Sequence, residues 1–182
     1  MKELTFITSH AKKAEELSRH LDFPVVHHKL DLPEIQSLDP SEVVVAKAKE
    51  AYRILNRPVL VEDYSITFSA LGALPGPLIK WFLQEMHIEG ICRLLDGYQT
   101  RQATARTCFA LCDEQGVHVF DGAITGTITD EPRGSHGFGM DAIFVPDGTE
   151  QTWGEMNEDD QIVYSLRRIG LKKLEVYLRK QV

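Results

Sequence analysis

The run Val59-Leu60-Val61 is short, apolar and unbroken, and it directly follows a helix-like segment. A run without polar alternation is typical of a strand covered on both faces. Asp39-Pro40 predicts where the preceding helix starts, because Asp is a good N-cap and Pro suits the first helical position. The apolar positions of that helix are Val44, Ala48, Ala51 and Leu55. A helix followed by a doubly covered strand favours an α/β fold.

The residues before this segment show the same alternation of strand and helix. Leu4 to Ser9 is apolar and β-branched, as expected of a strand. Ala14, Leu17 and Leu21 then follow at the spacing of an amphipathic helix. Pro24 to Leu30 predicts a second strand. The first third of the chain therefore predicts the order strand, helix, strand, helix, strand.

The rest of the chain predicts a mixed sheet with further helices. Alternating apolar and polar residues from Arg101 to Cys112 predict a half-buried strand, and a turn at Asp113 to Gly116 leads into its partner. The other expected elements are a helix starting at Pro77, a short helix near 89–95, strands at 117–128 and 142–145, and a helix near 161–180. Without an internal repeat or a long linker, we expect residues 1–182 to form one α/β domain with two lobes.

Composition excludes several classes of protein. Lys and Arg number 20 against 27 Asp and Glu, which gives a net charge of −7 and argues against binding to nucleic acid. No apolar run approaches the ~18 to 20 residues of a membrane span, and the N-terminus lacks the features of a signal peptide. We therefore expect a cytoplasmic protein. Its three cysteines, Cys92, Cys108 and Cys112, are predicted to be reduced core thiols.

Two lysines are expected at unusual positions, in the first turns of helices. Lys13 falls in the first turn of the first helix, and Lys80 in the first turn after Pro77. A cation is disfavoured there by the helix dipole, whereas a bound anion would compensate. The two positions together favour a phosphate-bearing ligand. The alternative is that both lysines simply extend into solvent.

Carboxylates are also expected at positions where α/β proteins bind ligands. Glu62 and Asp63 follow the apolar run and are expected to end that strand, and Glu34 lies in a Pro-containing loop. Acidic groups beside phosphate-binding lysines are explained if Mg²⁺ bridges them to phosphate. For Glu34 alone, a solvated loop carboxylate is the alternative.

The segment from Arg133 to Asp141 is a Gly-rich loop around an aromatic ring. Gly134, Gly137 and Gly139 flank Phe138. The loop backbone could approach a ligand closely while Phe138 stacks on it. The alternative is an ordinary Gly-rich loop.

Several motifs together resemble one known family. They are TSHAKKAEEL, LPEIQ, VEDYSITFSALGALPGPLIKWFL, PRGSHGFGMD and SLRRIGLKKL. From Phe6 to about Leu178 the chain resembles the inosine triphosphate pyrophosphatases, also called non-canonical purine NTP pyrophosphatases. The resemblance implies an elongated two-lobed α/β fold, a central mixed sheet flanked by helices, a ligand cleft between the lobes, and a homodimer. It also implies hydrolysis of ITP, dITP and XTP to the monophosphate and pyrophosphate, with Mg²⁺ as cofactor and Mn²⁺ as a possible substitute.

The resemblance assigns roles to individual residues. Asp63 matches the carboxylate proposed to activate water, with Glu62 beside it and Lys13 as a further catalytic residue. Glu34 matches the metal-associated glutamate, so Glu34 and Asp63 are the expected metal ligands. The expected substrate-binding residues are Thr8, His10, Lys13, Lys47, Tyr64, Lys80, Phe138, Met140, Asp141, Ser165 and Arg167.

The chain departs from the family pattern at five motif positions. His10 replaces an Asn, Tyr64 a small hydroxyl residue, Met140 a Trp, Gln161 a Lys and Leu166 a His. The matching carboxylates and lysines favour retained chemistry, whereas the departures concern mostly the base. Two alternatives remain beside the standard substrate: the same reaction on a different nucleoside triphosphate, or a nucleotide-binding protein with little turnover.

Overall fold

The computed structural model of the chain describes residues 3–9, 11–21 and 23–180, without the side chains of Ala11, Lys12 and Glu16. Among these residues there are seven strands, and they form one sheet. Their bounds are Leu4–Ile7 (β1), Val25–His28 (β2), Val59–Phe68 (β3), Pro75–Gly76 (β4), Gln102–Asp113 (β5), Gly116–Ile128 (β6) and Phe144–Pro146 (β7). The order is β2-β1-β3-β5-β6-β7, and β4 pairs with β3.

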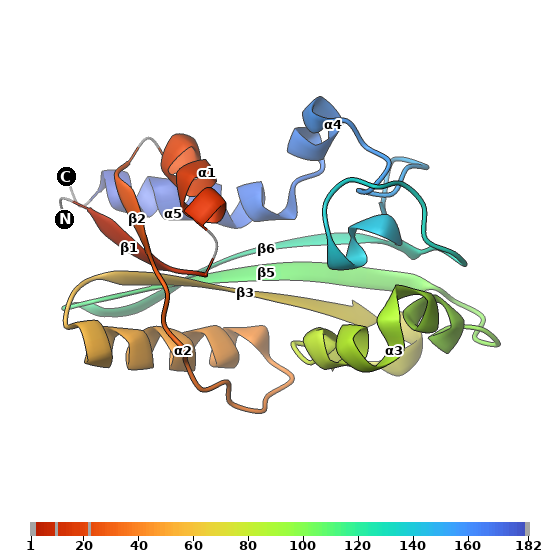
Figure 1. The fold of residues 1–182 in the computed structure, drawn as a ribbon, viewed down its shortest axis with the longest axis horizontal. Coiled ribbons are helices and arrows are strands. Elements are labelled where there is room, and N and C mark those ends of the chain that lie inside the picture. Colours follow the sequence, from red (N-terminus) through yellow and green to blue (C-terminus); the bar gives the residue numbers. More distant parts are fainter. Residues whose placement is uncertain (1–2, 10, 22, 181–182) are drawn as a thin grey trace. The chain divides into compact units, whose positions relative to one another are not determined.

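The sheet is mixed, as the sequence predicts. Strand β1 is parallel to both β2 and β3, whereas β3–β4 and β6–β7 are antiparallel pairs. The helices are Ala11–Leu21 (α1), Pro40–Leu55 (α2), Ile79–Leu94 (α3), Glu158–Val163 (α4) and Leu166–Arg179 (α5), with short 3₁₀ turns at Ser69–Leu71 (η1) and Gly139–Ala142 (η2) (Figure 1). The predicted α/β class is therefore confirmed.

The chain divides into two compact units. Unit 1 contains Met1–Asp63, Thr107–Gly122 and Arg167–Val182, and unit 2 contains Tyr64–Arg106 and Ala123–Leu166. Strands β3, β5 and β6 each contribute residues to both units.

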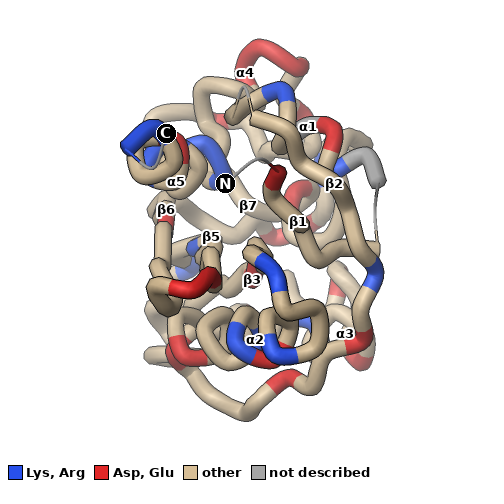
Figure 2. The backbone as a smooth tube through the Cα atoms, turned by 90° about the vertical axis from the view of Figure 1, so that its left-hand side faces the viewer, with Lys and Arg blue, Asp and Glu red and all other residues tan. Residues whose placement is uncertain are grey.

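Helices cover both faces of the strands in unit 1. Helix α2 lies on one face, and α1 and α5 lie on the other, as the end-on view in Figure 2 also shows. Val59 and Val61 pack with Val44 and Ala48 of α2. Leu60 instead packs with residues of α1 and α5, among them Leu17, Leu171 and Leu174. This alternation follows from the two-residue period of a strand, and it confirms that the run is covered on both faces.

Helix α2 begins where the sequence predicts. The Asp39 carboxylate accepts a hydrogen bond from the Ser41 backbone N–H at 2.8 Å, and Pro40 is the first helical residue. The helix ends at Asn56, which adopts a left-handed conformation with φ = 49°. Both ends therefore follow common capping chemistry.

A single hydrophobic cluster forms the core of unit 2. Its fully buried aromatic residues are Phe68 and Phe144, and Phe144 stacks on Trp153 with ring centroids 4.4 Å apart. Ile66 and Phe68 belong to this cluster. Their burial explains why β3 continues past Asp63, although the sequence predicted that the strand ends at Glu62 and Asp63.

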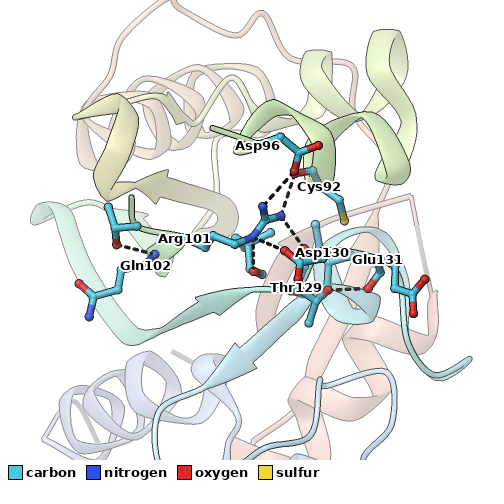
Figure 3. A network of polar contacts seen from close by, with 10 residues as sticks. Cys92, Asp96, Arg101, Gln102, Thr129, Asp130 and Glu131 are labelled. Atoms are coloured by element: carbon cyan, nitrogen blue, oxygen red, sulfur yellow. Dashed lines mark hydrogen bonds and ion pairs between the residues drawn. The ribbon is translucent and has the colours of Figure 1, made fainter. Parts of the chain in front are cut away.

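Arg101 connects separate parts of unit 2 through a network of polar contacts (Figure 3). Its guanidinium donates to the backbone carbonyls of Cys92, Ile128 and Thr129 at 2.7 to 2.9 Å. It also forms ion pairs with Asp96 and Asp130 at 3.3 and 3.2 Å. The side chain thus links the end of α3 to the end of β6.

Two expected helices have different bounds in the structure. Pro77 precedes α3, whose first helical residue is Ile79, and the helix is interrupted at His87, where φ is 56°. The final helix is divided into α4 and α5 at Tyr164 and Ser165. Two apolar residues of this segment, Ile162 and Ile169, are 50% and 39% exposed. Because Ile162 does not join the core, no continuous apolar stripe holds the two segments together as one helix.

The three cysteines are buried free thiols, which confirms the prediction. Among the residues that the structure describes, no helix is both long enough and apolar enough to cross a membrane.

Candidate active site

Glu62 and Asp63 project from opposite faces of β3. Side chains two residues apart on a strand point to the same face. Glu62 therefore points with Leu60 toward α1 and α5, and Asp63 points with Val61 toward α2. Each carboxylate meets cations from the helices on its own face. The sequence predicts the two carboxylates side by side at the end of a strand, but the strand continues, and the alternation of its side chains places the carboxylates on opposite faces.

The first cluster of charges lies on the α2 face and contains Glu34, Lys47 and Asp63. The Lys47 ammonium donates to a carboxylate oxygen of Glu34 and to one of Asp63, both at 2.9 Å. Lys47 and Asp63 are 14% and 12% exposed, whereas Glu34 is 41% exposed. The site is therefore half-buried and opens to solvent on the side of Glu34.

Burial has opposite consequences for the two ends of the Lys47–Asp63 pair. Burial raises the pKa of Asp63, and repulsion from Glu34 and Glu62 adds to it, so the attraction of Lys47 only partly offsets the rise. Burial by itself would lower the pKa of Lys47, but its contacts with Asp63 and Glu34 outweigh that effect and raise it. Lys47 thus stays charged, while Asp63 has more affinity for a proton than an ordinary aspartate.

The second cluster lies on the α1 and α5 face and contains Lys13, Glu62 and Arg167. The Arg167 guanidinium holds the Glu62 carboxylate through two hydrogen bonds of 2.6 and 3.1 Å. The Lys13 ammonium lies 3.8 Å from the same carboxylate. The carboxylate of Glu62 thus pairs with two cations, Lys13 from α1 and Arg167 from α5.

Glu34 and Asp63 fit the requirements of a divalent cation. Both carboxylates converge on one positive charge, because the Lys47 ammonium lies between them. Among the described residues there is no group of three or more His, Cys, Asp and Glu side chains that could hold a metal. Mg²⁺ at phosphate sites typically uses only one or two carboxylates and completes its shell with water and phosphate oxygens. Glu34 and Asp63 therefore supply as many carboxylates as such a site uses, and they are the residues that could hold a divalent cation.

The remaining residues expected near the phosphates come from different parts of the fold. Lys13 and Lys80 do lie in the first turns of α1 and α3. Lys80 belongs to unit 2, where its ammonium lies 5.6 Å from the centroid of the Trp81 ring. Thr8 follows β1, and its backbone N–H donates to the His28 carbonyl. His10 lies outside the described residues.

The Gly-rich loop of unit 2 presents Phe138 to solvent. The Phe138 ring is 76% exposed. Its backbone N–H donates to the Asp141 carboxylate at 2.8 Å, so Asp141 fixes the backbone under the ring. Gly137 has φ = +74°, and a Cβ there would lie 2.1 Å from an Asp141 oxygen. Glycine is therefore required for the contact that presents Phe138.

Met140, which is expected to bind substrate, and Leu166, which replaces a His of the family pattern, are both buried in the core of unit 2. Met140 is 3% exposed and Leu166 is 6% exposed, and both belong to the hydrophobic cluster of this unit. Met140 lies in η2, whose turn directs it inward while Phe138 stays outside. The expectation that Met140 replaces an aromatic wall of the base site is therefore not supported by its position.

Polar residues near the end of unit 2 are occupied by structural contacts. The Gln161 amide donates to the carbonyls of Trp153 and Met156 at 3.1 and 3.3 Å. Gln161 thus holds the turn before α4, which gives this departure from the family pattern a structural role. Ser165 is half-buried at the break between α4 and α5.

Sequence reasoning missed two features of the site. The resemblance implies that Arg167 binds substrate, but it gives no indication that Arg167 pairs with Glu62, which lies 105 positions away. Sequence reasoning also missed His136, whose Nδ1 lies 2.8 Å from the Met156 carbonyl and pins the loop that carries Phe138. Neither contact has a local sequence signal.

Comparisons with known proteins identify relatives over nearly the whole chain. Residues 4–177 match the Ham1 family. The chain is 42% identical to the inosine triphosphate pyrophosphatase of Yarrowia lipolytica over 98% of this chain and 96% of the relative. It is 40% identical to inosine triphosphate pyrophosphatase 2 of Trypanosoma cruzi, over 96% and 91% of the two chains.

The fold is likewise that of known structures. The Ham1 protein of Staphylococcus aureus superposes with a TM-score of 0.89 over 100% of both chains, at 23% identity. The resemblance drawn from the sequence motifs is confirmed by the family match and by the two relatives of about 40% identity. This chain belongs to the Ham1 family.

Proposed function

We propose that the protein hydrolyses non-canonical purine nucleoside triphosphates, namely ITP, dITP and XTP, to the monophosphate and pyrophosphate. The names of its relatives of about 40% identity support this assignment. The reaction adds one water across the bond between the α- and β-phosphates, so that pyrophosphate leaves as one group.

The observation that carries the proposal is the ammonium of Lys47, shared at 2.9 Å between Glu34 and Asp63. A half-buried carboxylate with a raised pKa is suited to accept a proton from the attacking water. Lys47 would orient the Asp63 carboxylate toward that water. Glu34 and Asp63 would hold Mg²⁺, which when bound neutralises phosphate charge and stabilises the leaving group.

The cations of the second cluster would bind the phosphates. Lys13 lies beside Glu62 at the start of α1, where helix N–H groups also favour an anion. Lys80 is the corresponding residue of α3. In this proposal the main role of Arg167 is to hold the Glu62 carboxylate in place through two hydrogen bonds.

Phe138 and Asp141 are proposed to bind the base. An exposed ring on a loop fixed by its own carboxylate contact is suited to stacking, because little rearrangement is needed. Thr8, His10 and Ser165 remain proposals that rest on the family resemblance alone. A homodimer, a cytoplasmic location and a single two-lobed domain are likewise proposals.

The decisive experiment measures products across a panel of nucleoside triphosphates. With Mg²⁺ or Mn²⁺ we expect ITP, dITP and XTP to yield pyrophosphate and the monophosphate, and ATP and pyrimidine triphosphates to react more slowly. Omitting the divalent cation should abolish turnover. Release of orthophosphate with a nucleoside diphosphate would contradict the proposed bond cleavage.

A second candidate is the same reaction on a different nucleoside triphosphate. It is favoured by the burial of Met140 and Leu166, because neither side chain offers a polar group to a purine. The same panel distinguishes it, since another base would then give the highest kcat/KM. Binding without any product would favour the third candidate, a nucleotide-binding protein with little turnover.

A further inference from the structure

The loop that carries Phe138 lies on the surface of unit 2. Residues 134–139 are all exposed, and Phe138 itself is 76% exposed. A surface loop buries little apolar area, so its hydrogen bonds largely decide how well it is ordered. A stacking ring on a mobile loop loses conformational freedom each time a base binds, which weakens binding. The hydrogen bonds of this loop therefore affect how well Phe138 can hold a base.

The backbone around Gly154 supports the loop. The Gly154 carbonyl accepts hydrogen bonds from the backbone N–H groups of Ser135 and His136 at 2.9 and 3.0 Å. The two backbones lie so close that a Cβ on Gly134 would be 2.1 Å from the Gly154 carbonyl oxygen. Met156, two positions further along, is fully buried in the hydrophobic cluster of unit 2. The support is therefore anchored in the core.

The side chain of His136 adds a bond to the same support. Its Nδ1 lies 2.8 Å from the Met156 carbonyl oxygen. A carbonyl oxygen only accepts hydrogen bonds, so Nδ1 carries a hydrogen and donates it. The Gln161 amide of α4 donates to the same oxygen at 3.3 Å, and the two lone pairs of a carbonyl oxygen allow two such donors. Because His136 lies two positions before Phe138, its bond fixes the chain next to the stacking ring.

We propose that His136 is a positioning residue for nucleotide binding. Its hydrogen bond to the Met156 carbonyl holds the loop so that Phe138 is ready to stack on the base. A bond that preorganises a binding element raises affinity, since less ordering is needed when the ligand binds. This inference rests on the proposed function, because it assumes that Phe138 stacks on the base of the nucleotide. His136 itself acts through Phe138.

Two substitutions at position 136 isolate the role of the hydrogen bond. His136→Leu removes the donor and keeps a side chain of comparable size. His136→Asn keeps a donor, because the amide nitrogen of asparagine can occupy the position of Nδ1. His27 on β2 is also an exposed histidine and belongs to unit 1, so His27→Leu is the matched control. Thermal unfolding of each variant shows that it is folded.

The experiment measures kcat and KM for ITP, and the inhibition constant of inorganic triphosphate, which has no base. His136→Leu should raise KM for ITP by roughly two- to tenfold, as expected for one neutral hydrogen bond, and leave kcat nearly unchanged. His136→Asn should recover most of the loss, and His27→Leu should show none. The inhibition constant of inorganic triphosphate should be the same in every variant.

A double-mutant cycle with Phe138 tests whether the effect passes through the stacking ring. Phe138→Ala should raise KM for ITP by itself. Because the ring is then absent, adding His136→Leu should raise KM no further. Independent effects of the two substitutions would contradict the positioning role.

Several results would overturn the inference, and they are distinguishable from failure of the proposed function. An unchanged KM in His136→Leu, beside a raised KM in Phe138→Ala, would overturn the inference alone. The same holds if ITP and inorganic triphosphate are affected equally, or if His136→Asn binds ITP no better than His136→Leu. A wild-type protein that does not hydrolyse ITP, or an unchanged KM in Phe138→Ala, would overturn the proposed function or its base site, and this inference with it.

Discussion

The ammonium of Lys47 lies 2.9 Å from the carboxylate of Asp63, yet the pKa of Asp63 is still raised. Burial and the repulsion of Glu34 and Glu62 outweigh the attraction of the lysine. The surroundings of Asp63 thus disfavour the charged form of its carboxylate. Such electrostatic strain is common at catalytic centres, where groups are placed for the reaction rather than for stability.

Asp63→Asn should therefore reduce activity while it relieves this strain. We expect turnover to fall by about 10²-fold or more, because the general base is lost. Nucleotide binding should largely remain. Pyrophosphate release and nucleotide affinity, measured on the same preparation, test the two parts separately. Unchanged turnover would remove Asp63 from the role of base.

The same substitution should change how stability depends on pH. A group whose pKa is raised by folding stabilises the protein below its unfolded value, near 3.8 for this residue, and the contribution is lost as pH rises through the folded pKa. The melting temperature of Asp63→Asn relative to wild type should thus increase from pH 3 toward neutrality. Asp121→Asn, on an exposed pair with Lys173, serves as the control. A relative melting temperature that falls with pH would contradict the assigned direction.

Arg167→Lys should weaken both the fold and the site, because lysine keeps the charge but cannot hold Glu62 through two bonds. The arginine also lies 6.0 Å from the centroid of the Phe109 ring. We expect a loss of about 1.5 to 3 kcal/mol in the free energy of unfolding, together with a higher KM. Denaturant unfolding measures the first effect. The exposed neighbour Arg168→Lys should change neither quantity, and equal effects of the two substitutions would contradict the role of the pair.

Arg101→Lys should destabilise unit 2 without altering the reaction. The guanidinium satisfies three backbone carbonyls at once, and a lysine ammonium cannot reproduce that planar arrangement. A buried carbonyl left without its donor costs about 1 to 3 kcal/mol. Thermal unfolding should show the loss, whereas Arg93→Lys on the exposed side of α3 should leave the melting temperature unchanged. A normal melting temperature for Arg101→Lys would mean that other donors replace it.

Sequence signals predicted those parts of the fold that depend on neighbouring residues. The N-cap of α2 is an example, because Asp39, Pro40 and Ser41 form it among themselves. The alternation of β5 and β6 similarly follows from the period of each strand. Where tertiary packing decides, the sequence was less informative. The extension of β3 to Phe68 depends on the core of unit 2. The break between α4 and α5 depends on which side chains are buried in that core.

The candidate site divides in the same way. Asp63 and Glu34 were singled out by their chain positions, and Lys47 by family resemblance. Pairing was not predictable, since Lys47 meets partners 13 and 16 positions away and Arg167 meets one 105 positions away. The position of a residue in a motif also does not indicate whether its side chain is buried. Met140 lies in a motif that resembles a ligand-binding segment of the family, but it is only 3% exposed.

Light scattering at micromolar concentration should give the mass of a homodimer. Trp81, Phe82 and Met86 all lie on α3, where Phe82 and Met86 pack partly against the core of unit 2. Trp81 remains 55% exposed. If this ring contributes to the dimer, Trp81→Glu should shift the mass toward the monomer without lowering the melting temperature at low protein concentration. A monomeric mass for the wild type would exclude the dimer.

Phe138 and Met140 lie two positions apart but should respond to substitution in opposite ways. Phe138 is 76% exposed, so Phe138→Ala should leave the melting temperature unchanged. Loss of stacking on a base should weaken nucleotide binding by about 1 to 3 kcal/mol. Met140 is 3% exposed in a packed core, and Met140→Trp should destabilise the fold by about 1 to 3 kcal/mol through overpacking. Thermal unfolding and KM for ITP, measured for both variants, separate the two effects. A Met140→Trp variant with unchanged stability and a lower KM would instead show that position 140 lines the base site.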